Sequence, residues 1–486
     1  MRKKLWSALA AIAAGGASAA AQSPAPIMPA PMPMSPAGMG MAMPMPTNGG
    51  QLPMSLPPGY QDPNQVFPGA GGPPGYGGPP PGYGGGEPGY PQGVHGEQKW
   101  ADPFGGGIDP QGVNSRLAPQ FWFTTEYFLG FAKSQPARFP FVVTSAPAAG
   151  GILGATSTTV LHAMSDLGYN LFSGARFDAG WYRDEGRRFG WNLGGFFTET
   201  KSNTYSISSD GSGQPLLARP FINAATNLPD VLLASFPTFA SGGIQVDTSS
   251  MAWGAEGGPI INLYRSCPED VALWNINLIT GFRYLEVRED MNFNSTSVIL
   301  PGNSVAFDGK IYGQDSRIAI SDNFDTRNSF YGGQIGLNTE LRLNRWFLSS
   351  TAKVAVGVVN ERIDINGFSV LSGPGSTNVS VARAGLFANS TNIGRYNEDR
   401  FAVVPEVHVN LGYTWRSWLT TSIGYNFLYL SRAARPGDQF SEIVNPANVP
   451  TSPNFGIGAG IATPNPLGTQ SSYWLQGVNF AITMRY

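Results

Sequence analysis

The stretch VNFAITMRY, from Val478 to Tyr486, decides the fold class. Val478, Phe480, Ile482, Met484 and Tyr486 are apolar or aromatic, and the residues between them are small or polar. Successive side chains of a β-strand point to opposite faces, so this stretch predicts a strand with one apolar face and one polar face. Such a strand is typical of a transmembrane β-barrel, in which one face meets lipid and the other meets the lumen.

The same alternation recurs through the C-terminal three-quarters of the chain. The predicted strands lie near 121–131, 173–182, 189–199, 251–264, 274–284, 334–343, 346–358, 403–413, 419–429 and 478–486. We therefore expect about 10 strands (10–12), and an even count is the rule for bacterial barrels.

The predicted connections alternate between short and long. Short ones fall near 183–188, 265–270, 344–345 and 416–417, and long ones near 132–172, 200–250, 288–328, 361–400 and 431–471. Short periplasmic turns and long external loops are the pattern of an outer-membrane barrel. A soluble β-sandwich also alternates in polarity, but it does not require alternating loop lengths. The sequence thus predicts an all-β, antiparallel up-and-down transmembrane barrel with long external loops.

Aromatic residues agree with this orientation. A predicted periplasmic girdle at the membrane interface comprises Trp122, Trp181, Trp191, Trp274, Trp346, Trp415 and Trp418. With an even number of strands, both ends of the barrel fall in the periplasm. Phe480 and the terminal Tyr486 resemble the signal that barrel-assembly machinery recognises, so that machinery and outer-membrane lipid are the expected partners.

The start of the chain predicts export. Arg2, Lys3 and Lys4 precede a short apolar run at 5–14, and small residues at 19–21 offer a cleavage site. This is the layout of a secretory signal peptide, residues 1–21. The alternative is a membrane anchor, but the apolar run is too short to span a bilayer. The predicted location is the outer membrane, after secretion and cleavage.

Residues 22–117 form a Pro/Gly/Met-rich segment that we predict to be a disordered periplasmic spacer, because it holds too few branched apolar residues to form a core. The barrel would then occupy 118–486. The spacer contains a methionine cluster, Met32, Met34, Met39, Met41, Met43 and Met45. Thioethers suit Cu(I), so copper capture is one hypothesis, and low-complexity drift explains the same letters. No other metal site and no cofactor is predicted.

Composition narrows the class further. Only 13% of residues are charged and 12% are aromatic, which is a low charge content for a soluble protein. No later stretch approaches the roughly 20 apolar residues that a membrane-spanning helix needs. The formal net charge of −2 argues against a nucleic-acid partner. The oligomeric state stays open.

Long stretches of the barrel region carry a family resemblance. They include TTEYFL (124–129), GFRYLEVRED (281–290), FDTRNSFYGGQIGL (324–337), NIGRYNEDRFAVVPEVHVNLGY (392–413) and WLQGVNFAITMRY (474–486). With these stretches the chain resembles beta-barrel porin family seven, a family of bacterial outer-membrane β-barrel proteins. The resemblance implies the fold and the location, and by its name transport, and it supplies no catalytic residues.

The predicted lumen face carries charges of both signs. The candidates are Glu126, Arg176, Asp178, Glu256, Arg283, Glu340, Arg342, Lys353, Glu406, His408 and Arg485. They could line a water-filled path and set ion selectivity, or they could pair and fill the interior. Barrels of about eight strands enclose only side chains, and open porins need about sixteen to eighteen. Ten strands favour a charge-paired, mostly occluded lumen, as in a low-conductance porin or passive small-solute channel.

Two other functions remain as alternatives. The long loops suit a structural or surface-anchoring envelope protein without transport activity. A barrel-borne hydrolase would need a general base, which is most often His, and the chain offers His95, His162 and His408. Glu406 and His408 share a strand face, but no G-x-S-x-G elbow accompanies the histidines. We therefore do not expect an enzyme.

Overall fold

The computed structural model describes residues 121–136, 139–163, 167–184, 186–266, 270–374, 379–457 and 461–486. The predicted signal peptide, the spacer with its methionine cluster, and His95 lie outside these residues. No helix among the described residues is long and apolar enough to cross a membrane.

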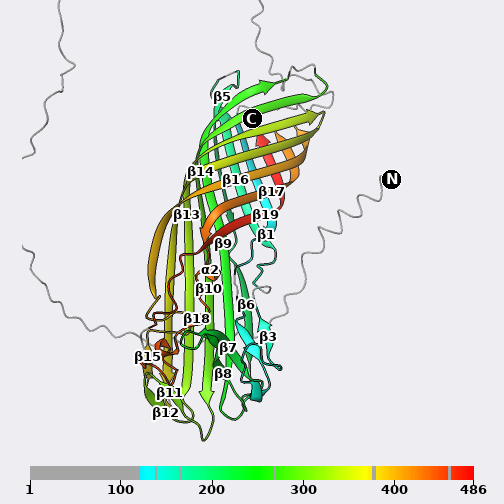
Figure 1. Ribbon diagram of the computed structural model, residues 1–486. Coiled ribbons are helices and arrows are strands. Elements are labelled where there is room, and N and C mark those ends of the chain that lie inside the picture. Colours follow the sequence, from blue (N-terminus) through cyan, green and yellow to red (C-terminus); the bar gives the residue numbers. More distant parts are fainter. Residues whose placement is uncertain are drawn as a thin grey trace, which may run out of the picture. The chain divides into compact units, whose positions relative to one another are not determined.

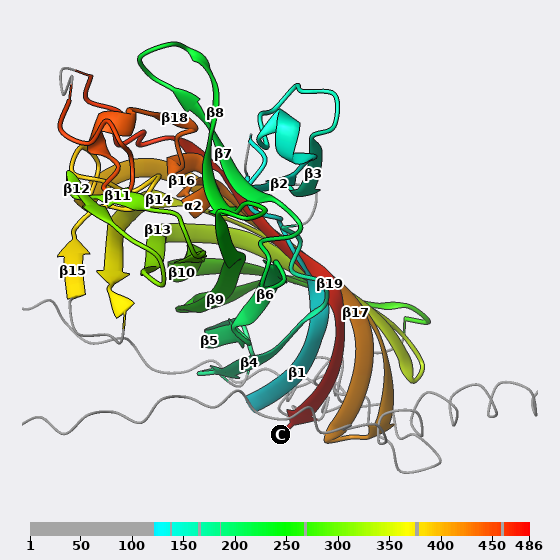
Figure 2. The same ribbon diagram turned by 90° about the horizontal axis from the view of Figure 1, so that it is seen from below.

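Antiparallel strands close into a ring, which confirms the predicted all-β barrel (Figure 1). Within the described residues the ring has ten strands. They are β1 (Phe121–Ala132), β4 (Phe172–Tyr182), β5 (Phe189–Thr198), β9 (Ala240–Arg265), β10 (Leu273–Ile299), β13 (Arg317–Leu343), β14 (Trp346–Ser372), β16 (Gly394–Arg416), β17 (Leu419–Ala434) and β19 (Gln470–Arg485). Each strand pairs with the next, and β19 pairs with β1 to complete the circle. Figure 2 shows β17, β19 and β1 side by side at this seam.

The seam is closed up to the last residue. Thr124 lies opposite Thr483 in the β1–β19 register, and their hydroxyl oxygens are 2.9 Å apart. The Phe121 N–H donates to the Tyr486 carbonyl at 2.9 Å, and the Tyr486 N–H returns a bond to the Phe121 carbonyl at 2.8 Å. The terminal segment therefore contributes backbone bonds as well as its predicted greasy face.

Several strands are much longer than predicted. The segments 240–250, 288–299, 317–328, 361–372 and 394–400, expected as external loop, continue β9, β10, β13, β14 and β16. Here the outward side chains change from apolar to charged and amide groups, so the pattern that marks a lipid-facing strand disappears although the strand continues. The expectation of external loops was wrong because it assumed that a strand ends where its lipid-facing pattern ends.

Beyond the ring these strands form a half-open sheet. Pairing of β16 with β17 stops at Glu406 and Leu428, whereas β14 and β16 stay paired as far as Ile365 and Gly394. On the other side β6 (Lys201–Ser208) takes over from β5 against β9, and β15 (Val379–Ala382) adds to the far end of β14. We call this half-open sheet, with the segments packed on it, the head.

The segments that complete the head come from the remaining connections. They are β2 (Val142–Thr144), β3 (Thr159–His162), β7 (Leu217–Asn223), β8 (Leu228–Ser235), β11 (Val305–Phe307), β12 (Lys310–Tyr312), β18 (Ile443–Val444), the one-turn helix α2 (Pro436–Gln439), and the 3-10 turns Pro147–Ala149 and Pro446–Asn448. Strands β18, β7, β2, β3 and β8 form a small second sheet. In Figure 1 these elements gather toward the end of the strands opposite the C-terminus, except α2, which lies nearer the middle of the long strands.

The inward residues of β10 describe the layers of the interior from the short turns outward. Asn275, Asn277 and Ile279 line a cavity, and Arg283 enters an ion cluster. The next inward residues, Leu285 and Val287, belong to a buried apolar cluster. Further out, Glu289 forms a buried ion pair with Arg435, and Met291 and Phe293 belong to the core of the head. The interior therefore alternates between polar and apolar layers along one strand.

Candidate functional site: the barrel interior

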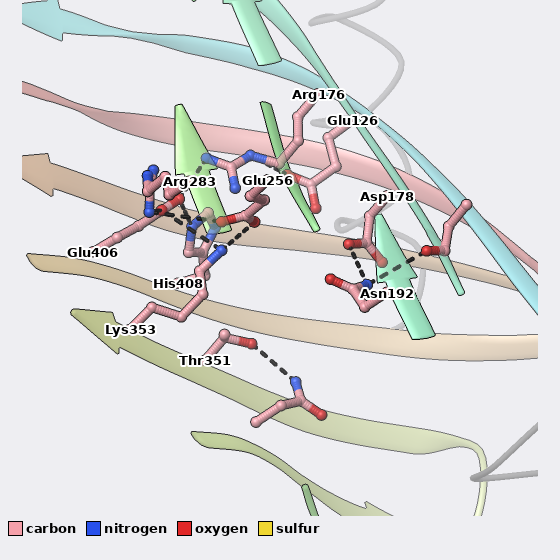
Figure 3. A network of polar contacts seen from close by, with 12 residues as sticks. Glu126, Arg176, Asp178, Asn192, Glu256, Arg283, Thr351, Lys353, Glu406 and His408 are labelled. Atoms are coloured by element: carbon pink, nitrogen blue, oxygen red, sulfur yellow. Dashed lines mark hydrogen bonds and ion pairs between the residues drawn. The ribbon is translucent and has the colours of Figure 1, made fainter. Parts of the chain in front are cut away.

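A cluster of opposite charges crosses the middle of the barrel (Figure 3). Its carboxylates are Glu126, Glu256 and Glu406, and its cations are Arg176, Arg283 and Lys353, with His408 beside them. These residues come from β1, β4, β9, β10, β14 and β16, so the cluster links strands around most of the ring. We call it the ion cluster.

Glu406 is the centre of the ion cluster, and its side chain is 1% exposed. One carboxylate oxygen, Oε1, accepts from Arg176 Nη2 at 2.7 Å and contacts His408 Nε2. The other, Oε2, contacts Arg283 and lies 3.6 Å from Lys353 Nζ. A buried carboxylate is tolerated only when such partners replace the water it has lost, and Glu406 has partners on both oxygens.

The two other carboxylates complete the charge balance. Glu256 contacts Lys353 and lies 3.7 Å from Arg283. Glu126 lies 4.0 Å from Arg176 and accepts a hydrogen bond from the Asn479 amide at 3.1 Å. Three carboxylates thus face three cations, so the layer is neutral apart from His408.

Asp178 lies next to the ion cluster and leads to one correction. Its carboxylate accepts from Trp122 Nε1 at 2.9 Å and from Asn192 Nδ2 at 2.8 Å. The Trp122 ring lines the interior cavity and packs on Tyr182, with 5.6 Å between ring centroids. Trp122 is therefore inside the barrel and not in the outer girdle that the sequence predicts. Phe121 and Phe123, its neighbours, project outward.

A second, smaller charged group lies near the short turns. Glu340 accepts from Arg342 at 2.7 Å and from Arg485 at 3.3 Å. Both guanidinium carbons stand 5.3 and 5.5 Å from the centroid of the Phe347 ring, a cation–π arrangement that stabilises desolvated arginine. Between this group and the ion cluster is a cavity of about 200 Å³, lined largely by amide, hydroxyl and charged side chains.

A dry layer covers the ion cluster on the side of the head. It includes Leu285, Phe330, Val359, Val404 and Leu430, whose side chains are all 0% exposed. An ion that crossed a layer of buried apolar side chains would have to give up its hydration there. The described interior therefore contains a fully buried apolar layer in addition to the charge pairs.

The dry layer is covered in turn by the segment around α2. Arg435 and Glu289 are both 0% exposed and join at 2.6 Å and 2.7 Å. Arg435 also donates to the carbonyls of Lys133 and Ser134, at the end of β1. All four residues of α2 are buried, and the helix lies inside the barrel mouth. We call the contact between Arg435 and Glu289 the latch.

The structure places each predicted lumen-lining charge inside the barrel, either on the cavity wall or buried next to it. Of the predicted girdle, the outward and exposed members are Trp181, Trp191, Trp274, Trp346, Trp415 and Trp418. Phe480 and Tyr486 also project outward, 48% and 86% exposed. Sequence reasoning missed the dry layer and the latch. The alternation YLEVRED at 284–290, with Leu and Val opposite Glu and Arg, was the signal that could have indicated a second inward apolar layer.

The two described histidines, His162 and His408, are engaged in packing and ion contacts. His408 contacts Glu406 within the ion cluster, and the His162 ring stacks on Tyr205 in the head with centroids 4.3 Å apart. Among the described residues no group of three or more His, Cys, Asp or Glu side chains is arranged to hold a metal ion. The copper hypothesis falls on residues that the structure does not describe.

Comparison with known proteins places the chain. The family model described as Putative beta barrel porin-7 (BBP7) matches residues 122–486. The chain belongs to this family. The match covers the whole ring and the head, so the family resemblance of the sequence is confirmed, and the protein is an outer-membrane β-barrel. No curated protein matches the chain in sequence.

Solved structures give distant likenesses. The outer membrane protease OmpT from Escherichia coli is 8% identical, with a TM-score of 0.31, and the match covers 75% of this chain and 97% of that chain. The toluene transporter TodX of P. putida is 8% identical, with a TM-score of 0.17, over 76% of this chain and 90% of that chain. OmpT of Vibrio cholerae is 9% identical, with a TM-score of 0.10, over 75% and 96%. At these scores the likeness says nothing about activity.

Proposed function

We propose that the protein is a sealed outer-membrane barrel that holds the head at the cell surface, in a structural or surface-anchoring role. The observation that carries this proposal is the pair of stacked closures, the ion cluster and the dry layer, across one ring. A general porin needs a continuous aqueous path, and ten strands leave little room beside the inward side chains. The size and packing of the head support a role outside the membrane.

A liposome-swelling assay tests the sealed interior. Full-length protein is reconstituted, and a small sugar is the permeant, with an open general porin as the positive control. We expect swelling no faster than in protein-free liposomes. Swelling at a rate comparable to the positive control would refute the proposal.

The orientation is tested by epitope tags on intact cells. One tag is inserted between Pro301 and Gly302, in an exposed turn of the head, and the matched tag between Asn344 and Arg345, in a short turn of the ring. An antibody added outside should label the first and not the second. The opposite result would place the head in the periplasm.

The second candidate is a low-conductance channel for ions or small solutes. The polar cavity of about 200 Å³ between the short turns and the ion cluster favours it. The dry layer lies between the cavity and the head, and α2 with the latch covers that layer. Conduction would therefore require α2 and the latch to leave the barrel mouth and the dry layer to open. Planar-bilayer recording distinguishes the two functions: small, infrequent openings support the channel, and silence supports the sealed barrel.

Catalysis is not part of the proposal. His408 lies against Glu406 among three cations, where it is one of the partners of the buried carboxylate. A hydrolase screen of the full chain, compared with a His162→Ala, His408→Ala variant, tests this point. Activity that the double substitution removes would contradict it.

A further inference from the structure

The outward face of the long strands changes character at one level. Tyr284 and Tyr331 lie opposite each other across β10 and β13, and they end the apolar part of the face. Four residues farther along each strand, Arg288 lies opposite Arg327, and Arg327 lies opposite Arg362 on β14. We call these three residues the arginine row. Like charges directly opposite each other on a sheet are unfavourable. A bound anion would relieve this repulsion, so the row is a candidate binding site.

The row lies at the height of lipid head groups. Along β14 the outward residues from Trp346 to Val358 mark the apolar band. Twelve residues at about 3.3 Å each, tilted by about 45°, span about 28 Å, close to the hydrocarbon thickness of a bilayer, about 30 Å. Arg362 lies four residues beyond Val358, about 9 Å higher by the same arithmetic.

A buried carboxylate fixes two members of the row. Glu286 is 0% exposed although it lies on the outward face. It accepts from Arg288 Nε at 2.5 Å and from Arg327 Nη2 at 2.6 Å. Trp253 Nε1 at 3.1 Å and the Tyr284 hydroxyl also donate to it. Glu286 thus holds two guanidinium groups with a single negative charge, so these three side chains together keep a net charge of +1.

The arginines keep donors available. Their side chains are 49% exposed at Arg288 and 43% at Arg327, and Arg362 is 36% exposed beside Asp364. The planar guanidinium presents a fork of N–H groups that matches phosphate oxygens. Below the row, the centroid of the Tyr284 ring lies 4.9 Å from that of Trp253 and 5.0 Å from that of Tyr331. These three rings continue into the lipid-facing band.

We propose that the arginine row binds the phosphate of a phosphorylated lipid head group in the leaflet next to the head, while the aromatic residues below it contact the acyl chains. The choice of lipid over free phosphate follows from this continuity, since only a lipid would occupy the aromatic surface and the row together. The assignment to the outer leaflet rests on the proposed orientation, but binding itself does not.

An acidic row lies one step beyond and sharpens the test. Asp290 lies opposite Asp325, and Asp325 opposite Asp364. These carboxylates repel a phosphate, so removal of one negative charge should tighten binding, and loss of arginine should weaken it. Opposite effects from neighbouring positions are not expected from a general loss of folding.

The experiment is native mass spectrometry of the full chain in detergent micelles. The probes are diphosphorylated lipid A, the same lipid after enzymatic dephosphorylation, and inorganic phosphate. The loss variant is Arg288→Gln, Arg327→Gln, and its matched control is Lys310→Gln, Arg317→Gln, which removes two exposed positive charges at the far end of the head. The gain variant is Asp325→Asn.

We expect the loss variant to bind phosphorylated lipid at least about tenfold more weakly, about 1.4 kcal/mol, and the control to bind as the wild type does. Asp325→Asn should bind about two- to threefold more tightly. Equal binding of the dephosphorylated lipid, or equal weakening in the control, would overturn the proposal. Inorganic phosphate that competes at the lipid's own concentration would show a free-anion site and overturn the lipid assignment. Because micelles have no sidedness, failure here is separable from failure of the tag experiment.

Discussion

Replacement of Glu406 by Gln tests whether the ion cluster is as closed as its geometry indicates. The substitution keeps the size and the hydrogen-bonding oxygen of the side chain and removes one of three negative charges. Arg176 and Lys353 retain Glu126 and Glu256 as partners, but Arg283 retains only Glu256, at 3.7 Å. One positive charge is thus left without a counter-charge among side chains that are 16% exposed or less.

The magnitude follows from burial. Removing one partner of a buried ion pair typically costs 3–5 kcal/mol, since the remaining charge stays desolvated. We therefore expect Glu406→Gln to lower the free energy of unfolding by about 3–5 kcal/mol. The matched control is Glu398→Gln on the same strand, where Glu398 and Arg400 are 42% and 45% exposed. An exposed pair of this kind is worth about 0–1 kcal/mol.

The assay is guanidinium unfolding of the full chain in detergent micelles, followed by tryptophan fluorescence. A second comparison uses the double variant Glu406→Gln, Lys353→Met, which restores a neutral cluster. It should be more stable than Glu406→Gln alone, because the two losses are coupled. The two substitutions are compared by the free energy of unfolding that each one removes. If the loss for Glu406→Gln exceeds that for Glu398→Gln by less than about 1 kcal/mol, water reaches the cluster and the proposal of a sealed interior is wrong.

Three further predictions follow from the dry layer and from the outward acidic row. Phe330→Ala should lower the free energy of unfolding by about 3–5 kcal/mol and raise current in bilayer recordings, whereas Phe282→Ala, on the lipid-facing side, should leave the current unchanged. Burial, with Asp290 and Asp364 nearby, raises the pKa of Asp325 to about 6. The contribution of the protonated carboxyl to stability is present below about pH 4 and is lost as pH rises through 6. Asp325→Asn should therefore stabilise the head at pH 7.5 by about 1–2 kcal/mol after allowance for its partial exposure, and not at pH 4. Asp364 shows the opposite sign, because hydrogen bonds from Arg395 and Arg362 outweigh burial and lower its pKa; Asp364→Asn should cost up to about 1 kcal/mol at pH 7.5, a loss that fades as pH falls below 4. Unfolding titrations of the two aspartate variants across this range check both signs, and parallel pH profiles would contradict the assignment.

Much of the ring could be predicted because lipid imposes a strict rule on one face of each strand. Val478 to Met484 obey it, and so do the six outward tryptophans beside the short turns. Trp122 was misplaced because period two fixes alternation and not which face is inside. Its neighbours Phe121 and Phe123 are also aromatic, so neither face was marked as polar.

The head could not be predicted for a related reason. Beyond Tyr284 the outward positions carry Glu286, Arg288 and Asp290, and the inward ones carry Leu285 and Val287. In the head the polarity of the two faces is reversed relative to the membrane-spanning part. A pattern that requires apolar outward residues therefore predicts a loop for this region. The partners within the ion cluster were equally out of reach, since they depend on the register of strands far apart in the chain. Arg176 and Glu406, for example, are separated by 230 positions.

The seam between β1 and β19 has a consequence for assembly. Thr124 and Thr483 are 359 positions apart in the sequence, and the entropic penalty of joining ends so distant must be met before the circle yields its final row of backbone bonds. Until then β1 and β19 each present an unpaired edge, the kind of edge that recruits foreign strands. Insertion should therefore be a late, concerted event, and a nascent molecule that stalls beforehand would be a target for aggregation or for proteolysis.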